Sequence, residues 1–271
     1  MMEQKLTEAA NFMFSEGTGV ALTGAGISAE SGILTYRDPG GLWDRFREGA
    51  AGGILGVIRN RPEEASTILS EFFSRLQAAR PNPGHHALAD LQRMGCLTSV
   101  ITQNIDNLHR EAGSTLVFEL HGNMFRLRCM QCGKKRHLGR DEFFSLAHDL
   151  VLAVRVSFDA MIDALPRCEC EGVMRPDFVG FGEAVQDLDV ATAECETCSW
   201  MLIIGTSGLV HPAASLPYRA MNHGAVLIEV NPKESELSSI ADVVIRAPSG
   251  EALPRLVKML KEMNSEKQGG Q

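Results

Sequence analysis

The sequence predicts an α/β fold in which a mostly parallel sheet is covered by helices on both faces. Short apolar runs typical of buried strands alternate with longer stretches at helical spacing along most of the 271 residues. The first apolar run is followed at once by two glycines and the start of a helix, which is an order typical of phosphate-binding parallel sheets. A hydrophobic content of 44% is enough for a large core.

Composition and charge exclude several classes of partner. The net charge of −8 argues against nonspecific nucleic-acid binding, which needs a basic surface. The N-terminus lacks the apolar segment of a signal peptide, and no apolar run reaches membrane-spanning length. We therefore expect a cytoplasmic protein with neither a nucleic-acid nor a membrane partner. In that compartment the seven cysteines stay reduced, which favours metal binding over disulfides.

The first 30 residues contain a candidate phosphate site. Residues 3–15 are expected to form an amphipathic helix, and residues 20–22 a buried strand. Gly24, Gly26 and Ala29 follow with the spacing G-x-G-x-x-A. Such glycines let the backbone approach a phosphate, at which the first N–H groups of the helix point. For so short a pattern, a plain tight turn is the alternative.

A long loop and a helical region follow. Residues 31–43 contain glycines, a proline and mixed polar residues, and are expected to form a loop beside the glycine turn. Arg37 in this loop is either a ligand for a phosphate or carboxylate, or a surface arginine. Residues 50–80 are expected to be helical, and a helix resumes at residues 85–94 after the break at 81–84.

Polar side chains follow two further predicted strands. The strand at residues 96–102 leads into Gln103, Asn104 and Asp106, and the strand at 115–120 ends at His121. The carboxyl ends of parallel strands are where open α/β sheets bind ligands. Asn104 or Asp106 can instead cap the next helix. His121 can serve as a general base, although a lone histidine is more often structural.

The cysteines suggest a zinc site with two possible second halves. Cys129 and Cys132 lie in a basic stretch, and after a helical region at residues 141–164 come Cys168 and Cys170. Four thiolates in two close pairs can hold one tetrahedral zinc ion. Cys195 and Cys198 have the more usual spacing, but they lie in a predicted helix at 187–198. Spacing alone leaves the second pair undecided.

The C-terminal third returns to alternating strands and helices. Gly205, Thr206 and Ser207 follow one predicted strand, and Asn231 follows the next. The polar tail at residues 264–271 is expected to be frayed. The predicted elements are strands at 200–204, 225–230 and 243–245, and helices at 212–223 and from Ser249 onward.

Taken together, these residues resemble the sirtuin family of NAD-dependent protein-lysine deacylases, in its prokaryotic form. The motifs occur in the order of the family between Leu22 and Pro232, and a fixed order of short motifs is more specific than any one of them. They are Gly24-Ala-Gly-Ile-Ser28, Gly32-Ile-x-x-Tyr-Arg37, Gly41-Leu-Trp43, Gln103-Asn-Ile-Asp106, His121-Gly122, Arg175-Pro-Asp177, Phe181-Gly-Glu183, Gly205-Thr-Ser207 and Asn231-Pro232.

The resemblance implies a Rossmann-like domain, a small zinc-ribbon module and a helical insertion. The Rossmann-like domain would comprise residues 1–48, 85–123 and 177–271. The helical insertion would span 49–84 and the zinc-binding module 124–176. NAD and an acylated lysine of a protein or peptide substrate would meet in the cleft between the domain and the module.

The resemblance also implies a role for each matched residue. His121 would be the general base, and Asn104 would join it as a catalytic residue. The residues that bind NAD would be Gly24, Ala25, Gly26, Ser28, Tyr36, Arg37, Gln103, Asn104, Ile105, Asp106, His121, Gly205, Thr206, Ser207 and Asn231. The residues that bind the substrate would be Val179, Phe181, Gly182 and Glu183. One structural zinc ion would be held by Cys129, Cys132, Cys168 and Cys170, because the family context favours this set over Cys195 and Cys198.

The implied reaction gives nicotinamide, free lysine and O-acyl-ADP-ribose. The alternatives are mono-ADP-ribosyl transfer or NAD hydrolysis and, from another class, a noncatalytic NAD sensor. Gly180 stands where many relatives have tryptophan, which leaves the peptide or acyl preference open. Relatives that remove succinyl or malonyl groups carry a Tyr-x-x-Arg pair in the helical region, whereas this sequence has Phe72, Phe73 and then Arg75. We therefore expect uncharged acyl substrates.

Overall fold

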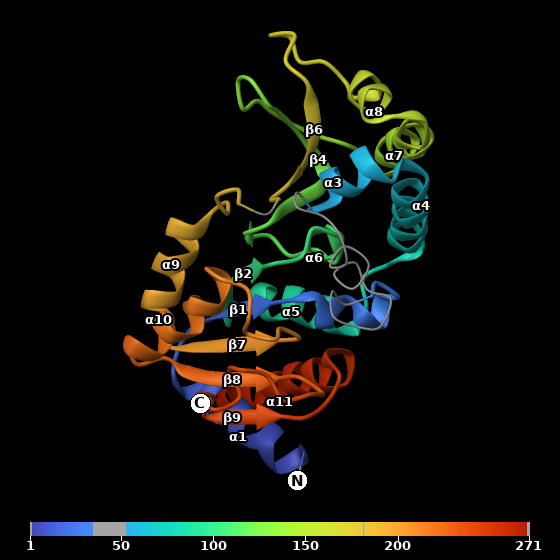
Figure 1. Ribbon diagram of the computed structural model, residues 1–271. Helices are drawn as coiled ribbons and strands as arrows, with labels where there is room; N and C mark the ends of the chain where they lie inside the picture. Colours follow the sequence, from blue (N-terminus) through green and yellow to red (C-terminus); the bar gives the residue numbers. More distant parts are fainter. Residues whose placement is uncertain (1, 35–52, 181, 270–271) are drawn as a thin grey trace.

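The main sheet of the protein contains six parallel strands in the order β3-β2-β1-β7-β8-β9 (Figure 1). The computed structural model describes residues 2–34, 53–180 and 182–269. The apolar runs expected to be strands all lie in this sheet, so the predicted parallel α/β fold is confirmed. The strands are β1 Gly19–Thr23, β2 Leu97–Thr102, β3 Val117–Glu119, β7 Trp200–Ile204, β8 Val226–Val230 and β9 Val243–Ile245.

Helices cover both faces of this sheet because alternate strand residues point to opposite sides. Ala21 of β1 packs in the core on one face, beneath α1 (Met2–Ser15), α5 (Pro83–Arg93) and α11 (Ser249–Gly269). Its neighbours Val20 and Leu22 pack in the core on the other face, beneath α9 (Leu188–Thr197) and α10 (Leu216–Asn222). The strands are therefore rich in apolar residues, and the central strand β7 is apolar throughout.

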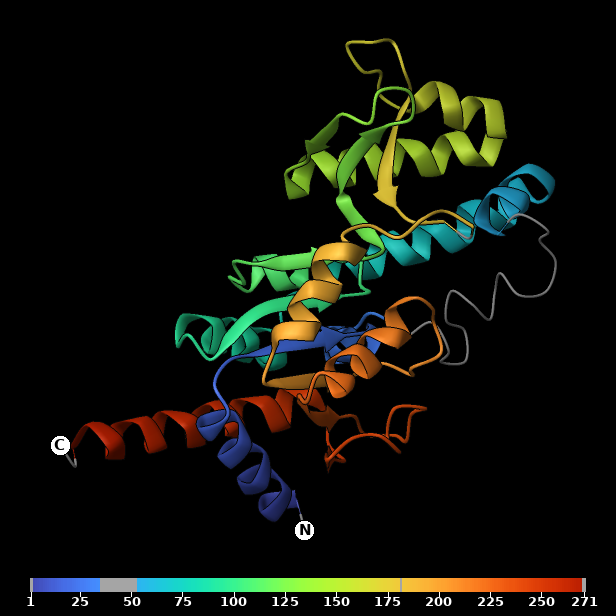
Figure 2. The same cartoon turned by 90° about the vertical axis from the view of Figure 1, so that its left-hand side faces the viewer.

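A second unit stands at the end of the molecule opposite the two chain termini (Figures 1 and 2). It contains a three-stranded antiparallel sheet in the order β5-β4-β6. Its strands are β4 Gly122–Cys129, β5 Lys135–His137 and β6 Met174–Phe178, and its helices are α7 Arg140–Val156 and α8 Phe158–Ala164.

The helical insertion packs on this second unit. It forms α3 (Gly53–Asn60) and α4 (Pro62–Ala78). Phe73 of α4 lies edge-on to Phe143 of α7, with ring centroids 5.8 Å apart. These rings continue into the apolar core beneath β4 and β6, so the insertion and the cysteine-bearing strands share one core.

Three elements differ from the sequence-based expectation. The segment after the glycine turn is a 3₁₀ helix, η1 (Ala25–Ser31), that ends at Gly32 in the left-handed region (φ 84°). The predicted helix at 212–223 is divided into a 3₁₀ turn, η2 (Ala213–Ser215), and α10. The expectation of a frayed tail is wrong, because α11 continues to Gly269 and Lys267 lies over the ring of Phe14 in α1.

None of the helices in the described residues is both long and apolar enough to cross a membrane.

Candidate active site

Two glycine turns pack against each other at the carboxyl ends of β1 and β7. The N–H of Gly24 donates to the carbonyl of Ile204 (3.0 Å), and the N–H of Gly26 donates to that of Gly205 (2.8 Å). A Cβ atom on Gly26 would lie 2.6 Å from the Cα of Gly205, and one on Gly205 would lie 2.5 Å from the nitrogen of Ile27. Only glycine allows this contact. The glycines therefore join two neighbouring strand ends into one continuous stretch of backbone, the glycine cradle.

The residues after β2 form a buried hydrogen-bonded group with Ser28 of η1. The Ser28 hydroxyl donates to Asp106 (2.6 Å) and accepts from the side-chain amide of Asn104 (3.1 Å). The same amide donates to the carbonyl of Gly24 (3.1 Å), and Gln103 donates to the Thr206 hydroxyl (3.0 Å). The structure thus brings together the predicted site residues from β1, β2 and β7.

His85 belongs to this group, although the sequence did not single it out. It is fully buried at the start of α5, and its Nδ1 accepts from the N–H of Asn82 (3.3 Å). Its Nε2 therefore carries the proton and faces the Ser28 hydroxyl at 3.4 Å. Burial lowers the pKa of His85 to about 2, so the ring is neutral. A sequence signal existed, because Asn82 and His85 have the spacing of a capping box.

His109 of the short helix α6 (Leu108–Glu111) is a second histidine that the sequence did not indicate. Its Nε2 lies 2.9 Å from the Thr23 hydroxyl, which donates to that of Thr102 (2.8 Å), and Thr102 accepts the N–H of Asn104 (3.0 Å). Burial lowers the pKa of His109 to about 3, and its Nδ1 has no hydrogen-bond partner among the described residues. His109 is thus hydrogen-bonded to the end of β1 at Thr23 and, through Thr23, to the end of β2 at Thr102.

Asp106 lies at the centre of the group and is buried. Burial raises the pKa of this carboxyl, although hydrogen bonds from Ser28 and from the N–H of Leu108 (3.0 Å) favour its charged form. The predicted capping of the next helix is therefore also present, because Leu108 is the first residue of α6. The same side chain caps a helix with one oxygen and holds Ser28 with the other.

His121 lies between β3 and β4, and so between the two sheets. Its Nδ1 is 3.0 Å from the carbonyl oxygen of Gln103. A carbonyl only accepts, so Nδ1 carries the proton and Nε2 is left with a lone pair. Partial burial lowers the pKa of the ring, while the hydrogen bond to Gln103 acts in the opposite direction. The arrangement gives a neutral, oriented imidazole at the junction of the two sheets.

The remaining predicted residues lie around the same edge. Asn231 follows β8 and donates to the carbonyl of Thr206 (3.0 Å), and the carbonyl of Ser207 accepts the N–H of Glu236 (3.1 Å). Ile105 packs against the apolar core beneath β4 and β6, and Ala25 is half-buried in η1. The predicted residues Tyr36, Arg37 and Phe181 lie outside the described residues.

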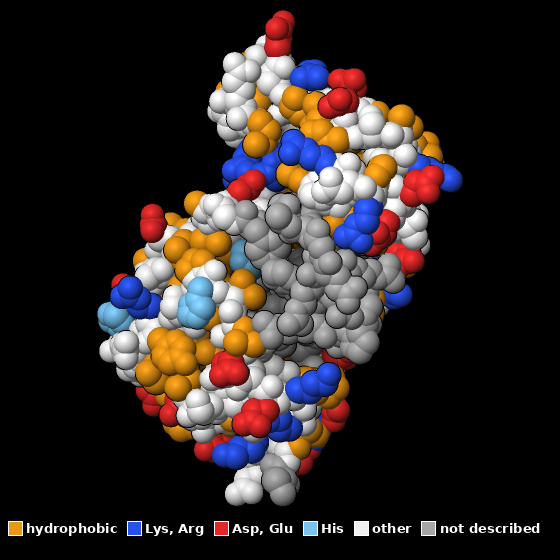
Figure 3. Space-filling model, in the orientation of Figure 1, with side chains coloured by type: hydrophobic (Ala, Val, Ile, Leu, Met, Phe, Trp, Pro, Cys, Tyr) orange, Lys and Arg blue, Asp and Glu red, His pale blue; other side chains and the backbone are white. Residues whose placement is uncertain are grey.

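The predicted substrate residues follow β6. Val179 donates its N–H to the carbonyl of His121 (2.9 Å), which ties this segment directly to the candidate base. Gly182 and Glu183 are exposed, and both carboxylate oxygens of Glu183 accept from Arg175 (2.6 Å each). Lys and Arg side chains gather over β4 and β6 in the space-filling view (Figure 3).

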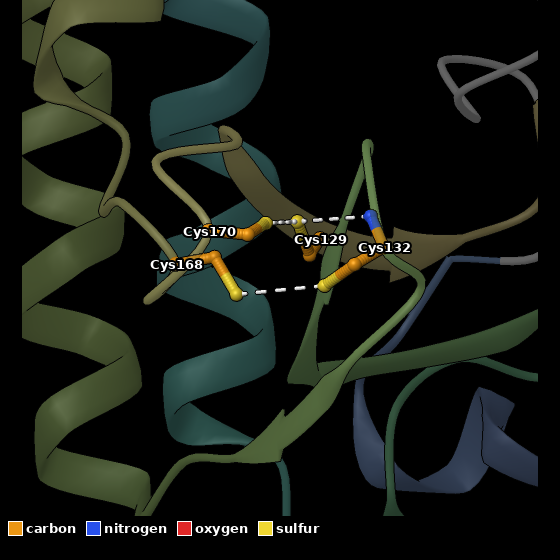
Figure 4. A group of neighbouring side chains, drawn as sticks. All are labelled: Cys129, Cys132, Cys168 and Cys170. Atoms are coloured by element: carbon orange, nitrogen blue, oxygen red, sulfur yellow. Dashed lines mark hydrogen bonds between the residues drawn. The ribbon is translucent and has the colours of Figure 1, made fainter.

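Four cysteines form a cluster that fits zinc (Figure 4). The Sγ atoms of Cys129, Cys132, Cys168 and Cys170 all lie within 4.8 Å of one another. The Cys129–Cys170 pair is 3.5 Å apart and the Cys132–Cys168 pair 3.7 Å. Ligands of a tetrahedral zinc–thiolate site are about 3.8 Å apart for bonds of about 2.3 Å. Backbone N–H groups of Cys132 and Gln131 lower the pKa of Cys129 to about 6, which favours the thiolate.

Cys195 and Cys198 are not part of this cluster. Both are buried at the end of α9 in the core of the main sheet. Burial raises the pKa of each thiol, that of Cys198 to about 11. They are packed as small apolar groups, and the choice of Cys168 and Cys170 over this pair agrees with the geometry.

Fold and site together define a Rossmann-like α/β protein with an attached four-cysteine module. The model of the Sir2 family matches residues 24–212, and the chain belongs to this family.

Relatives and solved structures agree with this family. A relative named NAD-dependent protein deacylase, from Desulfosudis oleivorans, is 42% identical, with 97% of this chain and 98% of that protein covered. One of the same name from Pyrococcus abyssi is 39% identical, with 95% and 99% covered. A mutant Sir2 homologue in complex with ADP-ribose has a TM-score of 0.78 at 34% identity, with 95% and 97% covered. A Sir2 structure with a p53 peptide and NAD+ has a TM-score of 0.74 at 31% identity, with 93% and 97% covered.

Proposed function

We propose that this protein is an NAD-dependent protein-lysine deacylase that gives nicotinamide, deacylated lysine and O-acyl-ADP-ribose. The observation that carries the proposal is the position of His121. Its Nε2 is free to take a proton because Nδ1 is held by Gln103, and it stands beside the polar group at the ends of β1, β2 and β7. The relatives of the same name cover nearly the whole chain and support the proposal.

The cradle formed by the two glycine turns fits the phosphates of NAD. Gly24, Ala25, Gly26 and Ser28 would hold them from β1 and η1, and Gly205, Thr206 and Ser207 from β7. Because Gly24, Gly26 and Gly205 lack a Cβ atom, the two turns lie in direct backbone contact, and backbone N–H groups at such a turn can bind phosphate. Asn231 would contact the ribose on the adenine side, and Tyr36 and Arg37 would contact the cofactor from the segment outside the described residues. Bound NAD supplies an electrophilic ribose carbon once nicotinamide leaves.

Gln103, Asn104, Ile105 and Asp106 are proposed to hold the nicotinamide half of NAD. Ile105 offers an apolar surface, since it packs in the core beneath β4. Asn104 and Asp106 have their positions set by Ser28 and, through it, by His85. Such an oriented polar group aligns the acyl oxygen of the substrate with the ribose carbon without reorganisation. Asn104 and His121 are the proposed catalytic residues.

His121 is proposed to accept a proton from a ribose hydroxyl at Nε2. Deprotonation makes that oxygen a nucleophile toward the acyl carbon. The acyl C–N bond to lysine breaks, one water molecule is consumed, and the products are the free lysine amine and an acyl ester on the ribose. The imidazole is neutral near neutral pH, because burial lowers its pKa. A plain NAD hydrolase or ADP-ribosyltransferase does not need this base.

The substrate is proposed to be an acylated lysine in a protein or peptide. Val179, Phe181, Gly182 and Glu183 would bind its backbone, since this segment follows β6 and is bonded to His121. The complexes of Sir2 proteins with a p53 peptide and with a propionylated peptide support this substrate class. One structural zinc ion held by the four-cysteine cluster would fix the two loops that carry the thiolates.

Mass spectrometry of the products from NAD and an acetyl-lysine peptide tests the proposal. We expect nicotinamide, free lysine peptide and O-acetyl-ADP-ribose in equal amounts. ADP-ribosylated peptide or protein would instead indicate a transferase, and free ADP-ribose with intact acetyl-peptide an NAD hydrolase. His121→Ala should lower kcat by about 10²–10⁴-fold while binding of ADP-ribose is retained. A fully active His121→Ala enzyme would contradict the assignment of the base.

A further inference from the structure

The backbone carbonyls of His121 and of the residue before it accept hydrogen bonds from the segment that follows β6. The carbonyl of His121 accepts the N–H of Val179, and the carbonyl of Leu120 accepts the N–H of Gln186, both at 2.9 Å. Gly122 has a positive φ of 81°, and a Cβ on it would lie 1.8 Å from the carbonyl oxygen of Asp177. The base and the two ends of the segment 179–186 therefore meet at one tight crossing.

One buried arginine contacts all three parts of this crossing. Arg126 of β4 donates from Nε to Asp177 of β6 (2.7 Å) and from Nη1 to Glu119 of β3 (2.7 Å). Its Nη2 lies 3.3 Å from the Oε1 of Gln186, whose amide donates to the other oxygen of Asp177 (2.8 Å). Glu119 precedes His121 by two residues, and Asp177 precedes Val179 by two. Arg126 thus binds the residue two positions before His121, the residue two positions before Val179, and Gln186 itself.

The carboxylates in this group are charged and fully partnered. Burial opposes ionisation of Glu119, but hydrogen bonds from Arg110 (2.9 Å) and Asn123 (2.6 Å), together with the charges of Arg110 and Arg126, lower its pKa. Asp177 is 0% exposed, and Arg126, Gln186 and Lys135 lower its pKa against the same effect of burial. Arg128 and Lys135 also approach Asp177, at 3.2 and 3.5 Å, and both are more exposed than Arg126.

Such an ion group adds little to the free energy of folding, because desolvation offsets much of the attraction. Its directional bonds can instead select one geometry. A planar guanidinium with three separate partners on β3, β6 and Gln186 fixes their relative positions, which an apolar side chain cannot do.

We propose that Arg126 is a positioning residue that holds His121, Val179 and Gln186 in one arrangement. The inference rests on the proposed deacylase function. It assigns to Arg126 an effect on the acyl-peptide half of the reaction and none on the binding of ADP-ribose at the glycine turns.

The test compares Arg126→Gln with the matched control Arg110→Gln in the full-length, zinc-loaded enzyme. Arg110 also binds Glu119 (2.9 Å), but it reaches neither Asp177 nor Gln186. For both variants we would measure kcat and KM for an acetyl-lysine peptide, the Kd for ADP-ribose by calorimetry, and the zinc content.

We expect Arg126→Gln to lower kcat/KM for the peptide by about 10- to 100-fold, since a small misplacement of reacting groups costs this much. The Kd for ADP-ribose should stay within about twofold of the wild-type value, as should every constant of Arg110→Gln. Equal losses in the two variants, or an unchanged peptide kcat/KM in Arg126→Gln, would overturn the proposal. So would a parallel loss of ADP-ribose binding, which would show a general loss of structure.

Arg126→Lys keeps the charge and provides a second variant if Arg126→Gln does not fold. A lysine offers a single point of contact, so the kcat/KM of Arg126→Lys should lie between the wild-type and Arg126→Gln values. If Arg126→Gln does not fold, the kcat/KM of Arg126→Lys should be about tenfold below the wild-type value. Wild-type-like peptide kinetics in Arg126→Lys would overturn the role of the three-way contact.

An NMR titration of the His121 ring gives a readout that does not depend on activity. We expect Arg126→Lys to shift the His121 resonances and Arg110→Gln to leave them in place; unchanged resonances in both would overturn the inference. A wild-type enzyme that deacylates no peptide would refute the proposed function instead, while the NMR comparison would still decide the role of Arg126.

Discussion

The Nδ1 atom of His121 lies 3.0 Å from the carbonyl oxygen of Gln103. This contact joins the residue before β4 to the residue after β2, and it assigns the ring proton to Nδ1. Nε2 is therefore the basic atom. The main chain of Gln103 orients the base, while its side chain binds Thr206 after β7.

The pH dependence of activity should report the pKa of His121. Partial burial lowers this pKa from its ordinary value of about 6.5. The base then loses its bound proton at a lower pH, so kcat/KM should rise to a plateau with an acidic midpoint below about 6.5. Initial rates with an acetyl-lysine peptide between about pH 5 and 8 test this expectation. A midpoint above about pH 7 would contradict it.

Stability should decrease in acid because His85 and His109 are buried as neutral rings. Burial lowers the pKa of His85 to about 2 and that of His109 to about 3. Below about pH 6.5 the unfolded chain binds two protons that the folded chain excludes. The free energy of unfolding should then fall by about 1.4 kcal/mol per pH unit for each histidine, in addition to the effect of other groups.

Urea unfolding of His109→Gln at about pH 7 and pH 5 isolates one of these contributions. The variant should lose less stability in acid than the wild type, by about 1.4 kcal/mol per pH unit. His148→Gln is the control, since the side chain of His148 is 71% exposed. If His109→Gln and His148→Gln showed the same dependence on pH as the wild type, the neutral buried state would be wrong.

Zinc content should distinguish the two cysteine pairs. Cys168→Ser should lose most of the bound zinc after dialysis, because it removes one of four clustered thiols. Cys195→Ser should retain one zinc ion per chain, since Cys195 lies in the core beneath α9. Elemental analysis of both purified variants checks the prediction. Full zinc in Cys168→Ser, or a loss confined to Cys195→Ser, would reverse the ligand assignment.

A methyl group in the glycine cradle should disturb both stability and ADP-ribose binding. Gly26→Ala places a Cβ 2.6 Å from the Cα of Gly205, and backbone must move to accommodate it. We expect a loss of about 1–3 kcal/mol in the free energy of unfolding and weaker ADP-ribose binding. Gly139→Ala is the control, because its φ is −64° and no atom lies within 4 Å of the added Cβ. Similar stability and affinity in both variants would show that the close contact has no effect.

Uncharged acyl groups should be removed faster than dicarboxylic ones. Phe72 stands three residues before Arg75 and lacks the hydroxyl group of the tyrosine in the Tyr-x-x-Arg pair of desuccinylating relatives, and Arg75 is exposed. A succinyl carboxylate without a cationic partner is costly to desolvate. The kcat/KM for an acetyl-peptide should exceed that for the matched succinyl-peptide by at least about tenfold. Faster desuccinylation would refute this preference.

The sequence by itself determined the strands and the class of fold, and it predicted most members of the proposed site. Apolar runs such as 200–204 predict strands of a parallel sheet, because helices cover both faces of such a sheet and its strands are rich in apolar residues. The polar residues that follow these runs converge because parallel strands share a carboxyl edge. The order of the short motifs determined the family, and the resemblance to that family implied the cofactor and the choice of Cys168 and Cys170 as zinc ligands.

Only the tertiary structure decided which distant residues complete the site. His85 and His109 join it through hydrogen bonds to Ser28 and Thr23, across separations of 57 and 86 residues, and no local pattern encodes such contacts. The close approach of Gly26 to Gly205 likewise depends on β1 and β7 being neighbours in the sheet. Arg126 appeared as part of a basic stretch, and its burial between Glu119 and Asp177 follows from the crossing of three strands. Periodicity and local spacing specify elements, whereas the packing of those elements specifies their partners.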